Sequence, residues 1–256
     1  MKKDRAYSSN QTQEKNMNHH RKTTSNWIAA TLAVAWLSTT LAVMPLAVAA
    51  DAVLGPDAAK AMPIADVHFH VMPWMNPQDL IPAMDRNNIR WAGGAGALGG
   101  PARNIEVAQT IGKRYIMATG QGPWLGLKQA AGQAVLENAD APGFKQALAN
   151  MERGLADPRV KVLGEIHVNT SSSAANPSLQ LKIRADAPTL KLMLELAGKY
   201  GKPLNIHAQW DSDTAQQVEA LARSSPASRL IISHCGVSSS ASDIRGVLQR
   251  NANVSC

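Results

Sequence analysis

The chain has 256 residues, of which 45% are hydrophobic and 18% are charged, the balance of a globular protein and not of a disordered one. The net charge of +7 does not indicate nucleic-acid binding, because residues 1–26 supply most of it, with six basic against two acidic residues. After residue 51 the basic residues do not cluster as a phosphate-binding face requires. Two cysteines, Cys235 and Cys256, are too few for a disulfide framework.

Residues 1–50 have the organisation of a secretory signal. A polar, basic stretch precedes an uncharged apolar stretch, 27–50, which contains Pro45 and ends in small residues. Cleavage there would leave a mature start near Asp51. The apolar stretch is also long enough to span a bilayer, so an uncleaved anchor is the alternative, and the only case in which we expect membrane contact. Both interpretations predict an exported protein, periplasmic if the organism is bacterial.

From residue 61 onward, short apolar runs alternate with helical patterns. We predict strands at 64–70, 90–92, 115–119, 160–168, 203–208 and 229–233, and the start of a seventh at 253–256. We predict helices at 77–88, 102–113, 142–156, 186–200, 212–223 and 241–250. Such alternation favours a parallel sheet with helices outside it, a pattern that open doubly wound sheets and closed barrels share.

The glycine-rich run at 93–100 follows the second predicted strand. It lacks a clean GxGxxG motif that opens a helix, so it is a weak signal for dinucleotide binding. We expect a flexible loop that borders a site. Asp213, near the start of the helix at 212–223, is interpreted as a helix N-cap in preference to a site residue.

Every histidine after the leader lies at the end of a predicted strand: His68, His70, His167, His207 and His234. In a barrel of parallel strands, catalytic residues gather at the carboxyl ends of the strands. The two-residue spacing of His68 and His70 places both on one face, and Glu165 and His167 repeat that geometry. Imidazole and carboxylate ligands without thiolate suit zinc, manganese, nickel or iron. We therefore predict one or two divalent ions, with zinc favoured.

Four motifs in order, ADVHFH, GEIHVN, NIHAQW and IISHCG, resemble those of the amidohydrolase superfamily, and more narrowly amidohydrolase-2-type metal-dependent hydrolases. The resemblance covers roughly residues 62–256 and implies a TIM-type (β/α)8 barrel over 51–256. It implies metal ligation by His68, His70, His207 and His234, with Glu165 where the family places a carboxylated lysine or glutamate. Catalytic roles are expected for Glu165 and His234. His167 has no fixed role in the superfamily, and a ligand or substrate contact and structural support both stay open for it.

The family also has an aspartate at the end of strand eight, which orients the attacking water and takes its proton. This sequence ends in what we predict as strand seven, so we expect a barrel truncated within that strand. A fragment, a truncated reading frame and a protein that completes itself by association are the open explanations. The resemblance implies a metal-dependent hydrolase that attacks a small-molecule amide, ester or lactone with metal-activated water. The alternatives are a non-oxidative decarboxylase on the same scaffold and an inactive fragment that at most binds metal. The expected partner is a small-molecule substrate. Whether the chain forms a homo-oligomer stays open.

Overall fold

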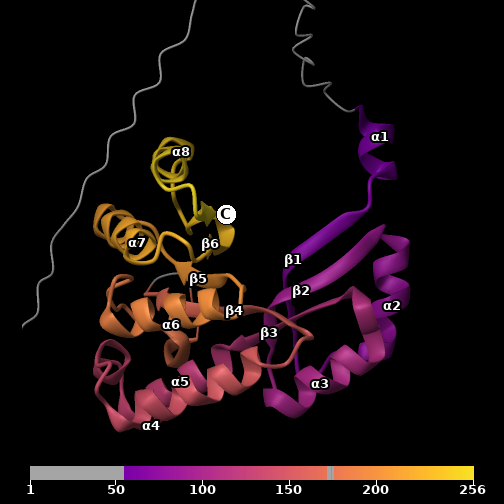
Figure 1. Cartoon of the computed structure of the whole chain (residues 1–256). Helices are drawn as coiled ribbons and strands as arrows, with labels where there is room; N and C mark the ends of the chain where they lie inside the picture. Colours follow the sequence, from indigo (N-terminus) through magenta and orange to yellow (C-terminus); the bar gives the residue numbers. More distant parts are fainter. Residues whose placement is uncertain (1–54, 172–173, 175) are drawn as a thin grey trace, which may run out of the picture. The chain divides into compact units, whose positions relative to one another are not determined.

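Seven parallel strands form one curled sheet whose spatial order, β1 to β7, follows the order of the chain (Figure 1). The computed structural model describes residues 55–256 except 172, 173 and 175, and these residues belong to one compact unit. The predicted signal or anchor at 1–50 lies outside the described residues. The strands are β1 (Ile64–Val71), β2 (Ile89–Ala97), β3 (Tyr115–Gly120), β4 (Val160–Asn169), β5 (Leu204–Ala208), β6 (Leu230–Ile232) and β7 (Val254–Ser255).

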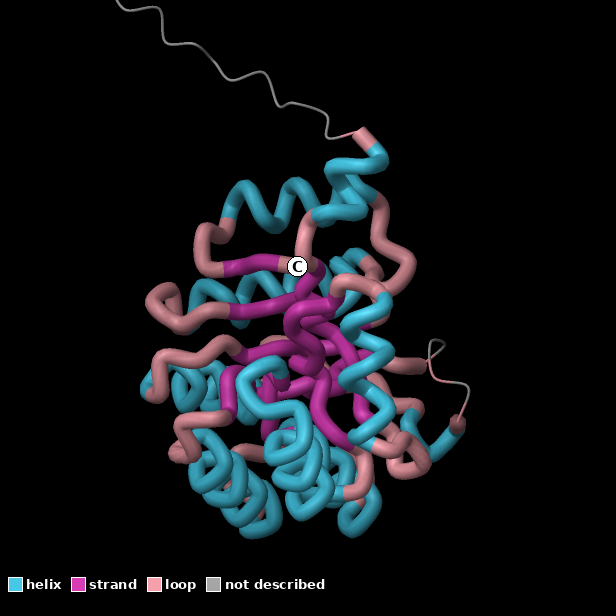
Figure 2. Tube along the Cα trace, turned by 90° about the vertical axis from the view of Figure 1, so that its right-hand side faces the viewer, coloured by secondary structure: helices cyan, strands magenta, loops and turns pink. Residues whose placement is uncertain are grey.

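Helices surround the sheet, and Figure 2 shows the strands gathered inside them. The α-helices are α1 (Pro56–Ala61), α2 (Pro77–Arg86), α3 (Gly100–Ile111), α4 (Gln121–Ala131), α5 (Pro142–Leu155), α6 (Pro188–Lys199), α7 (Ser212–Ser224) and α8 (Ala241–Arg250). The 3₁₀ helices are η1 (Gly112–Arg114), η2 (Ala134–Glu137), η3 (Pro177–Leu179) and η4 (Ser233–Cys235). Among the described residues, none of these helices combines the length and apolar character that crossing a membrane requires.

The predicted alternation of strands and helices is confirmed, and the sheet curls into a half-barrel, as a TIM-barrel-like arrangement would. The central strand β4 is buried at nearly every position, because helices cover one face of the sheet while its curvature encloses the other. Helix α4 was not predicted. A proline near its start, Pro123, and a glycine just after its end, Gly132, are the sequence signals that mark it.

Residues 93–97 of the glycine-rich run belong to β2 and only its end forms a turn into α3, so the prediction of a flexible loop over 93–100 was wrong. Gly93, Gly94 and Gly96 lie within β2 and are buried between β1 and β3. A Cβ atom on Gly94 would lie 2.1 Å from the carbonyl oxygen of Val67, and one on Gly93 would lie 2.3 Å from that of Ile116. Both glycines also have positive φ angles. Glycine is therefore required here for close strand contact and not for mobility.

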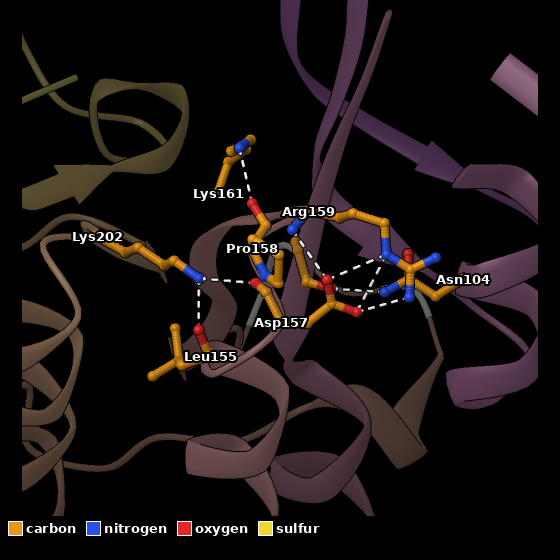
Figure 3. Close-up of polar contacts among 8 residues, drawn as sticks. Asn104, Leu155, Asp157, Pro158, Arg159, Lys161 and Lys202 are labelled. Atoms are coloured by element: carbon orange, nitrogen blue, oxygen red, sulfur yellow. Dashed lines mark hydrogen bonds and ion pairs between the residues drawn. The ribbon is translucent and has the colours of Figure 1, made fainter. Parts of the chain in front are cut away.

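The turn between α5 and β4 is held by charged side chains at the amino ends of the strands (Figure 3). Lys202, just before β5, donates from Nζ to the carbonyl oxygens of Leu155 and, at 3.0 Å, Asp157. The Asp157 carboxylate in turn pairs with the guanidinium of Arg159 at 2.6 Å. These contacts cap the carboxyl end of α5 and fix the start of β4, the strand that carries Glu165.

Candidate metal centre

The predicted site residues come together at the carboxyl ends of four strands. His68 and His70 lie on β1, Glu165 and His167 on β4, and His207 on β5. His234 follows β6 directly, in η4. The structure thus brings all six predicted residues together, although 166 positions separate the first from the last in the chain.

The Glu165 carboxylate is the centre of this cluster, and only 1% of its side chain is exposed. Its Oε2 atom lies 3.5 Å from His68 Nε2, 3.2 Å from His70 Nε2 and 3.6 Å from His167 Nε2. The other oxygen, Oε1, accepts a hydrogen bond from His207 Nδ1 at 2.8 Å and lies 3.7 Å from His234 Nε2. Both carboxylate oxygens therefore face imidazole nitrogens.

Two overlapping sets of ligand atoms within this cluster have the spacing needed to hold a metal ion. The first set is His68, His70 and Glu165, and the second is Glu165, His167 and His207. Within each set the candidate ligand atoms lie within 4.8 Å of one another. Glu165 belongs to both sets, so the cluster could hold one ion or two. His234 lies at the border of the cluster and belongs to neither set among the described residues.

The protonation of the cluster is strongly perturbed. Burial raises the pKa of the Glu165 carboxyl, but hydrogen bonds from His167, His207, His68 and His70 outweigh it and hold that pKa well below its ordinary value. Burial, followed by the charge of His68, lowers the pKa of the His234 imidazole. A buried carboxylate faced by several imidazoles is thus kept ionised.

The donor set fits a divalent cation. In the described part of the chain, no lysine or arginine pairs with Glu165, so histidines are its only neighbours of potentially positive charge. A buried, ionised carboxylate requires a compensating charge. The Nδ1 atoms of His70 and His167 are also buried and have no hydrogen-bond partner among the described residues. Because Nε2 of each ring faces Glu165, these Nδ1 atoms lie on the other side of the ring, where a water molecule would satisfy them.

Two features near the cluster were not predicted from the sequence. Trp124, on the unpredicted helix α4, donates from Nε1 to the carbonyl oxygen of His167 at 2.8 Å and fixes the end of β4. Cys235 and Cys256 form a single disulfide, which the sequence analysis did not predict. The available signal was that Cys235 follows one predicted strand and Cys256 lies within the next, and consecutive strands are usually neighbours in a parallel sheet.

A hollow of about 1170 Å³ opens beside the cluster. His207 and His234 line it together with apolar residues of α8, among them Ile244 and Leu248. His234 is the most exposed of the five histidines, with 42% of its side chain accessible. His234 is therefore the more accessible of the two histidines that line the hollow.

One predicted role near the site was wrong. Asp211, and not Asp213, is the N-cap of α7, and its carboxylate accepts a hydrogen bond from the backbone N–H of Thr214 at 2.7 Å. Asp213 is the second residue of α7, and its negative charge in the first turn interacts favourably with the helix dipole.

Comparison with known proteins gives no independent identification. No protein-family model matches the chain, and no curated protein matches it significantly. The class that the fold and the site define is therefore an α/β protein with a curled parallel sheet and a buried histidine–glutamate group that could hold a metal ion.

Proposed function

We propose that this protein is a metal-dependent hydrolase of the amidohydrolase type that acts on a small-molecule amide, ester or lactone. The observation that carries the proposal is the convergence of five imidazoles from four strand ends on the buried carboxylate of Glu165. Sites of this kind at the carboxyl ends of parallel strands are where barrel enzymes carry their chemistry. The resemblance of the four sequence motifs supports the same conclusion, as does the half-barrel, which we interpret as part of a (β/α)8 barrel.

His68, His70, His207 and Glu165 would hold the metal, with His234 and His167 completing the set. Zinc suits these ligands best, and manganese, nickel and iron are also compatible. The bound ion would supply Lewis-acid activation of water and of the scissile carbonyl group. Glu165 would balance the charge of the ion, and its two oxygens face different histidines, so it could serve two ions.

His234 is the proposed catalytic residue that faces the substrate, because it is exposed to the hollow while the other four histidines are more buried. Its imidazole could exchange a proton with a bound molecule. The apolar wall of the hollow on α8 favours a substrate with an apolar portion.

The test is turnover of a panel of small esters, lactones and amides by metal-loaded protein, with release of carbon dioxide from small carboxylic acids measured in parallel. Metal-dependent hydrolysis that is lost in Glu165→Gln and kept in Glu195→Gln is the expected result. Glu195 is an exposed residue of α6, so its substitution makes the same chemical change away from the site. Carbon dioxide release without hydrolysis would favour a decarboxylase, and bound metal without turnover would favour an inactive fragment.

A further inference from the structure

His234 lies at the border of the cluster, where its ring centroid is 4.2 Å from that of His68 and 5.2 Å from that of His207. It follows a strand of only three residues, β6, and its nitrogen is the farthest of the five from Glu165, at 3.7 Å. The backbone of His234 and of Cys235 lies in the left-handed region, with φ angles of 59° and 53°. Non-glycine residues rarely adopt this conformation, and two in succession persist only where the surroundings impose it.

Hydrogen bonds hold both ends of this turn, and the backbone N–H of Gly236 donates to the carbonyl oxygen of Ser233 across it at 3.0 Å. Ser233 Oγ donates to Asn205 Oδ1 at 2.6 Å before it, and the backbone N–H of Val237 donates to the carbonyl oxygen of Ala208 at 2.9 Å after it. Gly236 packs against the ring of Trp210. Cys235 directly follows His234. It forms a disulfide with Cys256, which lies immediately after β7.

The geometry points to a positioning role for this disulfide: we propose that the Cys235–Cys256 bond holds the turn after β6 so that His234 faces Glu165 and completes the metal site. Cys256 then acts through Cys235 and touches neither metal nor substrate. Because β7 pairs with β6, the bond joins the turn to the neighbouring strand and limits the conformations open to it. This inference rests on the proposed metal centre.

The experiment is a zinc titration of the full chain as a double-mutant cycle. Four proteins are compared: wild type, the pair Cys235→Ser with Cys256→Ser, His234→Ala, and all three substitutions together. Replacing both cysteines leaves no thiol that could itself bind zinc. Mass spectrometry of unreduced peptides first establishes that wild type carries the bond, and free thiols there would overturn the proposal.

If the disulfide positions His234, its removal weakens zinc binding by about 10-fold, the size of effect that loss of a supporting residue has at metal sites. In the His234→Ala background the same removal has no further effect on zinc affinity, because the disulfide acts on the metal site only through His234. If the disulfide only stabilises the fold, its removal lowers the melting temperature in both backgrounds and leaves zinc affinity unchanged.

Unchanged zinc affinity in the serine pair, or an equal loss in both backgrounds, would overturn the positioning role and leave the metal centre standing. Wild type that binds no zinc would overturn the metal centre and this inference together. Circular dichroism establishes that each variant is folded. Should the serine pair fail to fold, Cys235→Ala with Cys256→Val, which keeps the apolar character of both positions, takes its place with the same outcomes.

Discussion

At the residue scale, the site depends on several side chains that share one carboxylate. His68 faces Glu165 Oε2 and His207 faces Glu165 Oε1, so each belongs to a different candidate ligand set. Replacing either by alanine should lower zinc affinity by at least about 10-fold, as loss of even a supporting residue does at metal sites. Far-ultraviolet circular dichroism should stay close to wild type. Isothermal titration with zinc measures the affinity, and unchanged stoichiometry and affinity in both variants would contradict the assignment.

A second residue-scale prediction concerns Tyr115, which is buried beneath α3. Its hydroxyl donates to Asn104 Oδ1 at 2.8 Å, and Asn104 Nδ2 donates to the carbonyl oxygen of Ala118 at 2.7 Å. Tyr115→Phe should lower the free energy of unfolding by about 1–3 kcal/mol, because Asn104 loses its donor inside the protein. Urea unfolding at neutral pH measures this change, and a loss well below 1 kcal/mol would show that the hydrogen bond contributes little.

The same tyrosine predicts a pH dependence. Burial raises the pKa of the Tyr115 phenol above its ordinary value, and the charge of Arg103 opposes this only in part. Because the folded state holds the proton more tightly than the unfolded one, its stabilising contribution is complete below about pH 10 and is lost as the pH rises further. Urea unfolding from pH 8 to 11 should therefore show a shallower alkaline loss of stability in Tyr115→Phe than in wild type. Equal slopes would contradict this.

The sequence predicted which site residues share one face of a strand, because that follows from the two-residue periodicity of strands. Spacing of two along a strand placed His68 beside His70 and Glu165 beside His167, and the structure confirms that all four face one centre. The Cys235–Cys256 bond was not predicted because the positions of the cysteines at consecutive strands allow the pairing, while the distance between them depends on how β6 and β7 lie beside each other. The N-cap of α7 was placed two residues late, within the usual uncertainty of helix ends.

At the element scale, the alternation of short apolar runs with helical patterns predicted the order and type of the strands. It did not predict how far β2 extends. Glycine is common both in loops and where strands approach closely. The close approach of Val67 and Ile116 to the β2 glycines, which the sequence does not reveal, distinguishes the two cases here. Helix α4 was missed because much of its sequence is small and polar, so its apolar stripe is short. Its Trp124 nevertheless contacts the strand that carries the site.

Substituting a glycine of β2 tests directly whether β1 and β2 pack as closely as the structure indicates. Gly94→Ala should destabilise the protein by several kcal/mol or prevent folding, because its Cβ would lie 2.1 Å from the carbonyl oxygen of Val67. Gly122→Ala is the control: Gly122 lies in α4 with no atom within 4 Å of the added Cβ, so stability should stay level or rise by up to about 1 kcal/mol. Chemical denaturation measures both. Similar effects of the two substitutions would contradict the close packing of β1 and β2.

At the scale of the whole molecule, the candidate metal centre joins β1, β4, β5 and the turn after β6. A bound ion would therefore link both halves of the sheet and favour the folded state. Zinc at 100 times its dissociation constant should stabilise the protein by about 2.7 kcal/mol. For a chain of this size, that corresponds to a rise in Tm of roughly 5–10 °C. Differential scanning calorimetry with zinc and then with excess chelator should show the rise and its reversal; a Tm that zinc leaves unchanged would contradict the link.

The central claim is that Glu165 and the surrounding histidines form a metal centre. The most direct measurement is metal content by mass spectrometry after loading with zinc and removal of free ions, in wild type, Glu165→Gln and Glu195→Gln. We predict one or two equivalents of zinc in wild type and in Glu195→Gln, and a marked loss in Glu165→Gln, since the amide cannot supply the negative charge that both candidate ligand sets share. Wild type without zinc, or equal zinc in all three proteins, would contradict the claim.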